Sequence, residues 1–114
     1  MSARLEAKLW LWQRATAAIL ALCVSVHLVT IIYAVRGGLT AAEILGRTRG
    51  SLAWGLFYAA FVIAASLHGA IGIRTVAIEW LGLRGAAAQA VAAAIAFALC
   101  ALGLRAVLAV VMAP

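Results

Sequence analysis

Charged side chains are scarce in this sequence of 114 residues. Asp, Glu, Lys and Arg together make up 11% of it, compared with about 25% in soluble domains. Apolar residues of the set AVILMFWYC make up 68%, well above the roughly 45–50% that is usual. So few charges cannot cover the surface of a small globule, which excludes an ordinary cytosolic enzyme, a disordered chain and a disulfide scaffold. The composition predicts an integral membrane protein.

Cysteine and acidic residues are also few. The two cysteines, Cys23 and Cys100, lie in apolar stretches and in no CxxC or Cys/His metal spacing, so we expect small buried hydrophobes. Nine basic residues against three acidic ones give a net charge of +6. The basic residues flank apolar stretches and do not interleave with aromatics, which indicates contact with membrane lipid and argues against nucleic acid.

Three uncharged stretches, at 15–35, 51–73 and 85–104, are each long enough to cross a bilayer. A helix rises about 1.5 Å per residue, so each spans about 30 Å, the thickness of the hydrocarbon layer. The sequence therefore predicts an all-α fold with three transmembrane helices in a single membrane-anchor domain, 1–114. Thr40 and Glu43 form a possible capping box, which predicts a short surface helix at about 40–46.

Basic residues are unequally divided between the two sides of the membrane. Five lie in the N-terminal segment and second loop, and three lie in the first loop. The five are Arg4, Lys8, Arg14, Arg74 and Arg84, and the three are Arg36, Arg47 and Arg49. The positive-inside rule then predicts a multi-pass protein of the inner (cytoplasmic) membrane with a cytoplasmic N-terminus and a periplasmic first loop. The first stretch is too long for a cleaved signal peptide, so we expect it to remain as an anchor.

The only two histidines, His27 and His68, each lie inside an uncharged stretch. An ionisable group there is costly to bury and indicates function, either a proton relay or axial ligation of a haem iron. Small residues surround His68 at one position or about one turn, namely Ala64, Ala65, Gly69 and Gly72. They would leave room for a flat macrocycle, which favours haem. The alternative is a histidine bonded to a backbone carbonyl, with the small residues serving helix packing; for His27 ligation and a structural role are equally favoured.

The two histidines are expected to lie at different depths. His68 precedes Arg74 by six residues and His27 follows Arg14 by 13, which places them roughly 10 Å apart along the membrane normal. Two imidazoles on one iron would have ring nitrogens only about 4 Å apart. The sequence therefore predicts that the two histidines serve two haems, each completed by a ligand from another chain.

Two short motifs resemble a known family. His-Gly-Ala-Ile-Gly-Ile-Arg at 68–74, followed by Glu79, resembles the second-helix signature of the membrane anchor (cytochrome b) subunits of succinate dehydrogenase and fumarate reductase. Gln-Arg-Ala-Thr-Ala at 13–17 resembles the first-helix entry of that family, usually His-Arg-x-Ser-Gly. Gln13 replaces the histidine and Ala17 replaces the glycine, which affects the expected contacts with quinone and haem propionates.

The resemblance implies a role for several residues. His68 would ligate haem b, and Arg14 would lie near the quinone site and the haem propionates. Thr16 would supply the hydroxyl of the family's serine. Arg74 and Glu79 would lie at the surface that docks the soluble subunits. His27 resembles the first-helix haem ligand of the two-haem members.

The function implied is that of a haem b-binding anchor subunit of a succinate:quinone oxidoreductase, forming half of a multi-helix haem-binding bundle. Its expected partners are a second membrane anchor subunit, an iron–sulfur subunit, a flavoprotein subunit and quinone. Its cofactors would be one or two haems shared with a partner, and the chain alone would not be catalytic. Two other classes remain open, a small transporter subunit and a cofactor-free interaction protein. The transporter is less favoured because Glu6, Glu43 and Glu79 all lie outside the apolar stretches.

Overall fold

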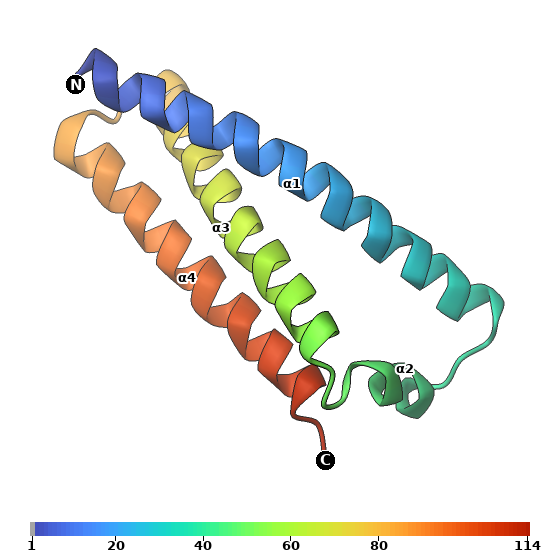
Figure 1. Ribbon diagram of the computed structural model, residues 1–114. Helices are drawn as coiled ribbons and strands as arrows, with labels where there is room; N and C mark the ends of the chain where they lie inside the picture. Colours follow the sequence, from blue (N-terminus) through green and yellow to red (C-terminus); the bar gives the residue numbers. More distant parts are fainter. Residues whose placement is uncertain (1) are drawn as a thin grey trace.

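The computed structural model describes residues 2–114 as four helices (Figure 1). They are α1 (Ala3–Arg36), α2 (Ala41–Thr48), α3 (Leu52–Leu81) and α4 (Gly85–Val111). No strand occurs in these residues. The three long helices are each apolar and long enough to cross a membrane. The prediction of an all-α protein with three transmembrane helices is confirmed.

Each long helix extends beyond the apolar stretch that indicated it. The first begins at Ala3, where the Ser2 side chain caps it by accepting a hydrogen bond from the Leu5 amide. Helix α3 continues past Arg74 to Leu81, and Gly82 caps it with a φ of 68°, a conformation that glycine adopts without strain. A charged residue ends an apolar stretch, but it does not end a helix, because the backbone hydrogen bonds continue. Charge patterning therefore marks the membrane boundary and not the helix boundary.

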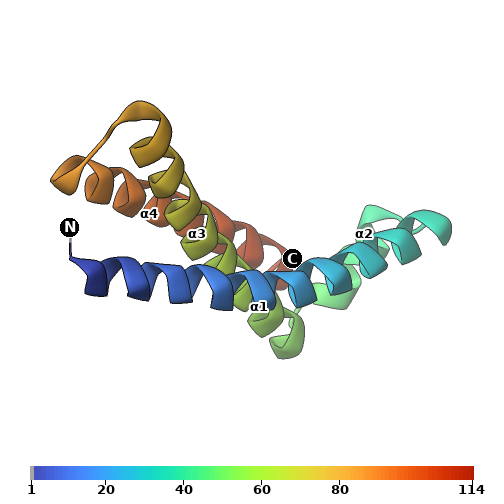
Figure 2. The ribbon, with the colours of Figure 1, turned by 90° about the horizontal axis from the view of Figure 1, so that it is seen from above.

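Helix α3 lies between the other two long helices, α1 and α4. It packs against α4 along its length and against α1 at a steeper angle (Figures 1 and 2). The N-terminus and the α3–α4 turn lie at one end of the bundle, and α2 and the C-terminus lie at the other. Many large apolar side chains are exposed, among them Leu22 (68%), Val35 (74%) and Phe97 (77%). Such a surface is stable against lipid or partner helices.

Close packing of α3 and α4 depends on Gly103. A Cβ at this position would lie 2.5 Å from Val62 Cγ1. We expect Gly103→Ala to destabilise the helix pair by about 1–3 kcal/mol through overpacking, measured as the free energy of unfolding in mixed micelles. The double variant Gly103→Ala/Val62→Ala should recover most of the loss. Equal stability of Gly103→Ala and the unchanged chain would contradict this packing.

The surface helix α2 is held at both of its ends. The Thr40 side chain accepts from the Glu43 amide, and the Glu43 carboxylate accepts from the Thr40 backbone N–H at 2.7 Å, forming the capping box. This N–H lowers the pKa of Glu43. At the other end the Thr48 hydroxyl donates to the Val110 carbonyl at 2.8 Å. The helix is thereby attached to the C-terminal end of α4.

Candidate functional site: two histidines at different levels of the bundle

His68 on α3 faces Thr16 on α1. The distance from His68 Nδ1 to Thr16 Oγ1 is 3.2 Å. Thr16 is among the most buried residues of the chain, with 2% of its surface exposed, and its hydroxyl also lies 2.7 Å from the Trp12 carbonyl and 3.1 Å from the Gln13 carbonyl. The contact therefore joins the two helices through a buried hydroxyl.

The partners of Thr16 bear on the protonation of the His68 ring. A hydroxyl has one proton, and two backbone carbonyls of the preceding turn lie within hydrogen-bond distance of the Thr16 hydroxyl. When that proton goes to a carbonyl, the hydroxyl oxygen accepts from Nδ1–H of His68, and Nε2 keeps its lone pair. No hydrogen bond to Nε2 occurs within residues 2–114. A ring with one N–H fixed and the other nitrogen unprotonated is the usual arrangement of a metal-ligating histidine.

The two glycines near His68 face different helices. A Cβ at Gly69 would lie 3.3 Å from Leu99 of α4, and a Cβ at Gly72 would lie 3.5 Å from Gln13 of α1. Because Gly69 follows His68 directly, it points about 100° away around the helix, and its small size serves the packing of α3 on α4. Gly72, one turn from His68, lies on the side of the Thr16 contact.

A cavity of about 560 Å³ lies between the N-terminal part of α1 and α3. Its lining comprises Glu6, Leu9, Trp10, Gln13, Ile71, Gly72, Arg74 and Thr75. The side-chain oxygen of Gln13 is buried there without a hydrogen-bond partner. Arg14 does not line the cavity; it is exposed, and its guanidinium lies over the Trp10 ring at 5.4 Å. The cavity combines the apolar side chains of Leu9, Trp10 and Ile71 with polar ones, among them Gln13 and the Glu6–Arg74 ion pair.

Arg74 lies inside the bundle, and the expectation that it lies at a docking surface is wrong. Only 3% of its side chain is exposed. It donates to the Glu6 carboxylate at 2.7 Å and through Nε to Gln89 Oε1 at 3.3 Å. The charge turns inward because a carboxylate on α1 and an amide on α4 are both within reach. These contacts join all three long helices, whereas Glu79 is exposed.

His27 lies nearer the α2 end of the bundle than His68 does. Its Nδ1 is 3.1 Å from the Tyr58 hydroxyl, and its ring meets the rings of Tyr58 and Phe61 edge to face. Tyr58 precedes His68 by ten residues on α3, or about 15 Å along the helix. Since His27 contacts Tyr58, the two histidines of this chain are too far apart to ligate one iron.

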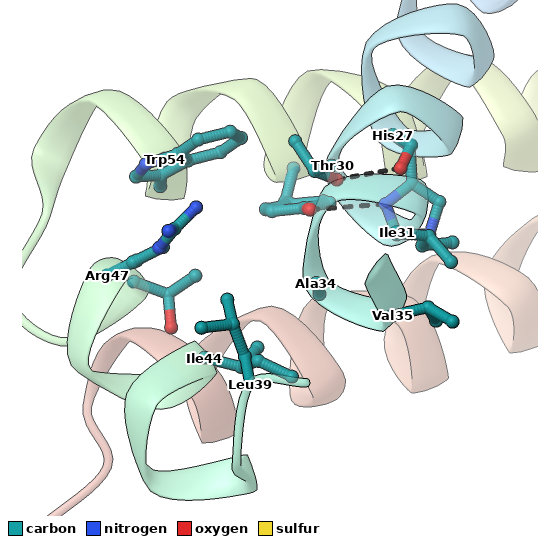
Figure 3. Close-up of a pocket in the computed structure, with 11 residues that line it drawn as sticks. His27, Thr30, Ile31, Ala34, Val35, Leu39, Ile44, Arg47 and Trp54 are labelled. Carbon is teal, nitrogen blue, oxygen red and sulfur yellow. Dashed lines mark hydrogen bonds between the residues drawn. The ribbon is translucent and has the colours of Figure 1, made fainter. Parts of the chain in front are cut away.

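A second cavity, of about 240 Å³, adjoins His27 between α1, α2 and α3 (Figure 3). Figure 3 shows Arg47 entering it from α2 beside Trp54, and the guanidinium also lies 4.6 Å from the Tyr33 ring centroid. The lining is Thr30, Ile31, Ala34, Val35, Leu39, Ile44, Thr48 and Tyr58 together with His27, Arg47 and Trp54. In residues 2–114 no group of three His, Cys, Asp or Glu residues could bind a metal ion. Either histidine would thus need further ligands from outside the chain.

Sequence motifs did not indicate three of the contacting residues, Glu6, Tyr58 and Gln89. Tyr58 and Gln89 are polar residues within apolar stretches, and that rarity was the available signal. The partner of each could not be inferred, because it lies on another helix.

Comparison with known proteins identifies one family. Residues 1–110 match the succinate dehydrogenase/fumarate reductase transmembrane subunit family. No curated protein matches the chain, and neither does any solved structure. The match covers nearly the whole sequence, including both histidines and all three spans. The chain is therefore a multi-pass membrane protein that belongs to the succinate dehydrogenase/fumarate reductase transmembrane subunit family.

Proposed function

We propose that the chain is a haem b-binding anchor subunit of a succinate:quinone oxidoreductase, with His68 as an axial ligand. The observation that carries this proposal is the His68–Thr16 contact, since a Thr16 hydroxyl that accepts from Nδ1–H would leave Nε2 of His68 unprotonated. A haem bound there would carry single electrons between the iron–sulfur subunit and quinone. The Thr16 hydroxyl would hold the imidazole in place through its contact with Nδ1.

The second axial ligand would come from a second membrane anchor subunit. Within the described residues His27 lies about 15 Å from His68 along the bundle. The chain therefore offers His68 as the one histidine ligand to a haem bound at that depth. The exposed apolar surfaces of the long helices would accommodate the partner helices. We place the N-terminal end of the bundle on the cytoplasmic side of the inner membrane, where the flavoprotein and iron–sulfur subunits would bind.

Quinone would bind in the cavity that Trp10 and Gln13 line. Its apolar walls suit a ring, and the Gln13 side-chain oxygen can accept a hydrogen bond from a quinol hydroxyl. After rotation of the amide, the same side chain can donate to a quinone carbonyl. Arg14 supports the site from outside by its contact with Trp10.

We expect Gln13→Leu to weaken quinone binding and leave succinate oxidation intact. Loss of one hydrogen bond in an apolar cavity costs about 1–2 kcal/mol, or roughly a 5- to 30-fold higher KM for quinone. Succinate-dependent reduction of quinone is compared with reduction of a soluble dye by the same complex. Ser25→Ala, on an exposed face of α1, is the control. An unchanged KM in Gln13→Leu would exclude quinone from this cavity.

A second haem at His27 is the alternative form of the proposal, as the resemblance implies. The separation of the two histidines permits it. It requires Nε2 of His27 to be unprotonated, so that Nδ1–H donates to Tyr58 and the Tyr58 proton passes to an acceptor outside the chain.

Purification of the tagged chain from native membranes tests the function as a whole. The proposal expects b-type haem, flavin and iron–sulfur clusters to copurify, together with succinate-dependent reduction of quinone. A purified assembly without haem would contradict the role of His68. An assembly without the two soluble subunits would favour a cofactor-free interaction protein.

A further inference from the structure

The two histidines have similar surroundings that differ in one respect. In each case a hydroxyl on the facing helix contacts Nδ1, Thr16 for His68 and Tyr58 for His27, at 3.2 and 3.1 Å. The difference lies in what else each hydroxyl can reach. Thr16 has backbone carbonyls within hydrogen-bond distance, as its position in the helix allows. Tyr58 has no hydrogen-bond partner besides His27 in the part of the chain that the structure describes.

A phenol proton inside a membrane protein needs an acceptor. Leaving it unbonded in an apolar setting is costly, and Nδ1 of His27 is the acceptor present in the described residues. If Tyr58 donates to Nδ1, the proton of the neutral imidazole must lie on Nε2. The ring stays in place through its edge-to-face contacts with Tyr58 and Phe61, whose centroids lie 5.6 and 5.7 Å away.

We propose that Thr16 and Tyr58 impose opposite tautomers on the two imidazoles. Thr16 holds His68 with an unprotonated Nε2, suited to a metal, and Tyr58 holds His27 with an Nε2–H, suited to an acceptor oxygen. Tyr58 is thus a positioning residue that decides against metal ligation at His27. The inference rests on the proposed function only in its reading of His68 as the ligand.

Nitrogen NMR of the full chain measures both tautomers directly. The chain is labelled with ¹⁵N in histidine and reconstituted in lipid without haem at about pH 8, above the ordinary pKa of histidine. Protonated and unprotonated ring nitrogens differ widely in chemical shift, and His68→Gln assigns the two rings. We expect Nε2 to be unprotonated in His68 and protonated in His27. An unprotonated Nε2 in His27, or a protonated one in His68, would overturn the proposal.

Tyr58→Phe tests whether the Tyr58 hydroxyl sets the tautomer of His27. This variant keeps the aromatic contact and removes the hydroxyl. We expect His27 to change from mainly the Nε2–H tautomer to a mixture of both tautomers. Phe61→Leu is the matched control, because it removes an aromatic neighbour of the same ring and no hydroxyl. Haemin is also titrated into the His68→Ala chain and into the double variant His68→Ala/Tyr58→Phe. The double variant should bind haemin roughly two- to tenfold more tightly, which corresponds to the free energy of one hydrogen bond. Tyr58→Phe without effect on the His27 tautomer would refute the role of the hydroxyl.

The tautomer experiment can fail or succeed independently of the test of the proposed function. The tautomers are measured without haem or partner subunits, so haem could be absent from the native complex while both tautomers are as expected. Conversely, haem could be held at His68 while His27 shows an unprotonated Nε2. In the first case the proposed function fails, and in the second the inference about Tyr58 fails.

Discussion

Replacement of His68 by alanine is expected to abolish the b-type haem spectrum of the purified complex. The Thr16 contact engages Nδ1 of His68, so the proposed ligand atom is Nε2, and alanine supplies no ligand. We expect haem content to fall at least tenfold, measured by reduced-minus-oxidised absorbance per complex. Electron transfer to quinone is measured in the same preparation.

Variants of Thr16 distinguish a loss of haem ligation by His68 from a general loss of folded protein. Thr16→Ser keeps a hydroxyl and should retain the haem, whereas Thr16→Val has nearly the same volume without one. Loss of a residue that orients a metal ligand typically lowers affinity 10- to 100-fold, and we expect Thr16→Val to fall in this range. Unchanged haem in His68→Ala, or equal haem loss in Thr16→Ser and Thr16→Val, would contradict the role assigned to the pair.

Arg74→Ala is expected to have the second large effect, on assembly of the chain. Arg74 is 3% exposed and contacts Glu6 on α1 and Gln89 on α4. Removal of its guanidinium therefore loosens all three long helices next to the cavity. We expect the amount of assembled complex in membranes to fall several-fold, as moderate destabilisation usually causes.

Matched variants test this interpretation of Arg74. Arg74→Lys keeps the charge but not the planar set of donors, so it should recover only part of the loss. Arg84→Ala removes a basic residue from the nearby turn, where Arg84 is exposed, and should leave the yield unchanged. Equal losses in Arg74→Ala and Arg84→Ala would indicate that membrane topology, and not the contact between helices, requires Arg74.

The membrane fold could be predicted because its main signal is local. An uncharged stretch of about 20 residues indicates a span without knowledge of its neighbours, and three such stretches gave the three long helices. The burial of Arg74 could not be predicted in this way. Its partner Glu6 is 68 residues away, and a basic residue near the end of a span is most often a surface charge. Only the packing of α1 on α3 brings the carboxylate to it.

The candidate site was predictable in part for the same reason. The rarity of histidine in an apolar stretch marks His27 and His68 without any structure. The direction of each neighbour is a matter of helix geometry, so Gly69 faces α4 while Gly72 faces α1. Tyr58 acquires its importance only from contact with His27 across two helices. Sequence alone identifies the imidazoles, and the structure identifies the hydroxyls that contact them.

The identity of the axial ligand is tested most directly by changing it. His68→Met replaces a nitrogen ligand by a thioether, which shifts the near-infrared charge-transfer band of a low-spin ferric haem and raises its reduction potential. Magnetic circular dichroism of the oxidised complex records the band, and a redox titration records the potential. Ligation by His68 predicts that the band shifts and the potential rises in His68→Met. A band and potential identical to those of the unchanged complex would show that the haem takes its ligands from other residues.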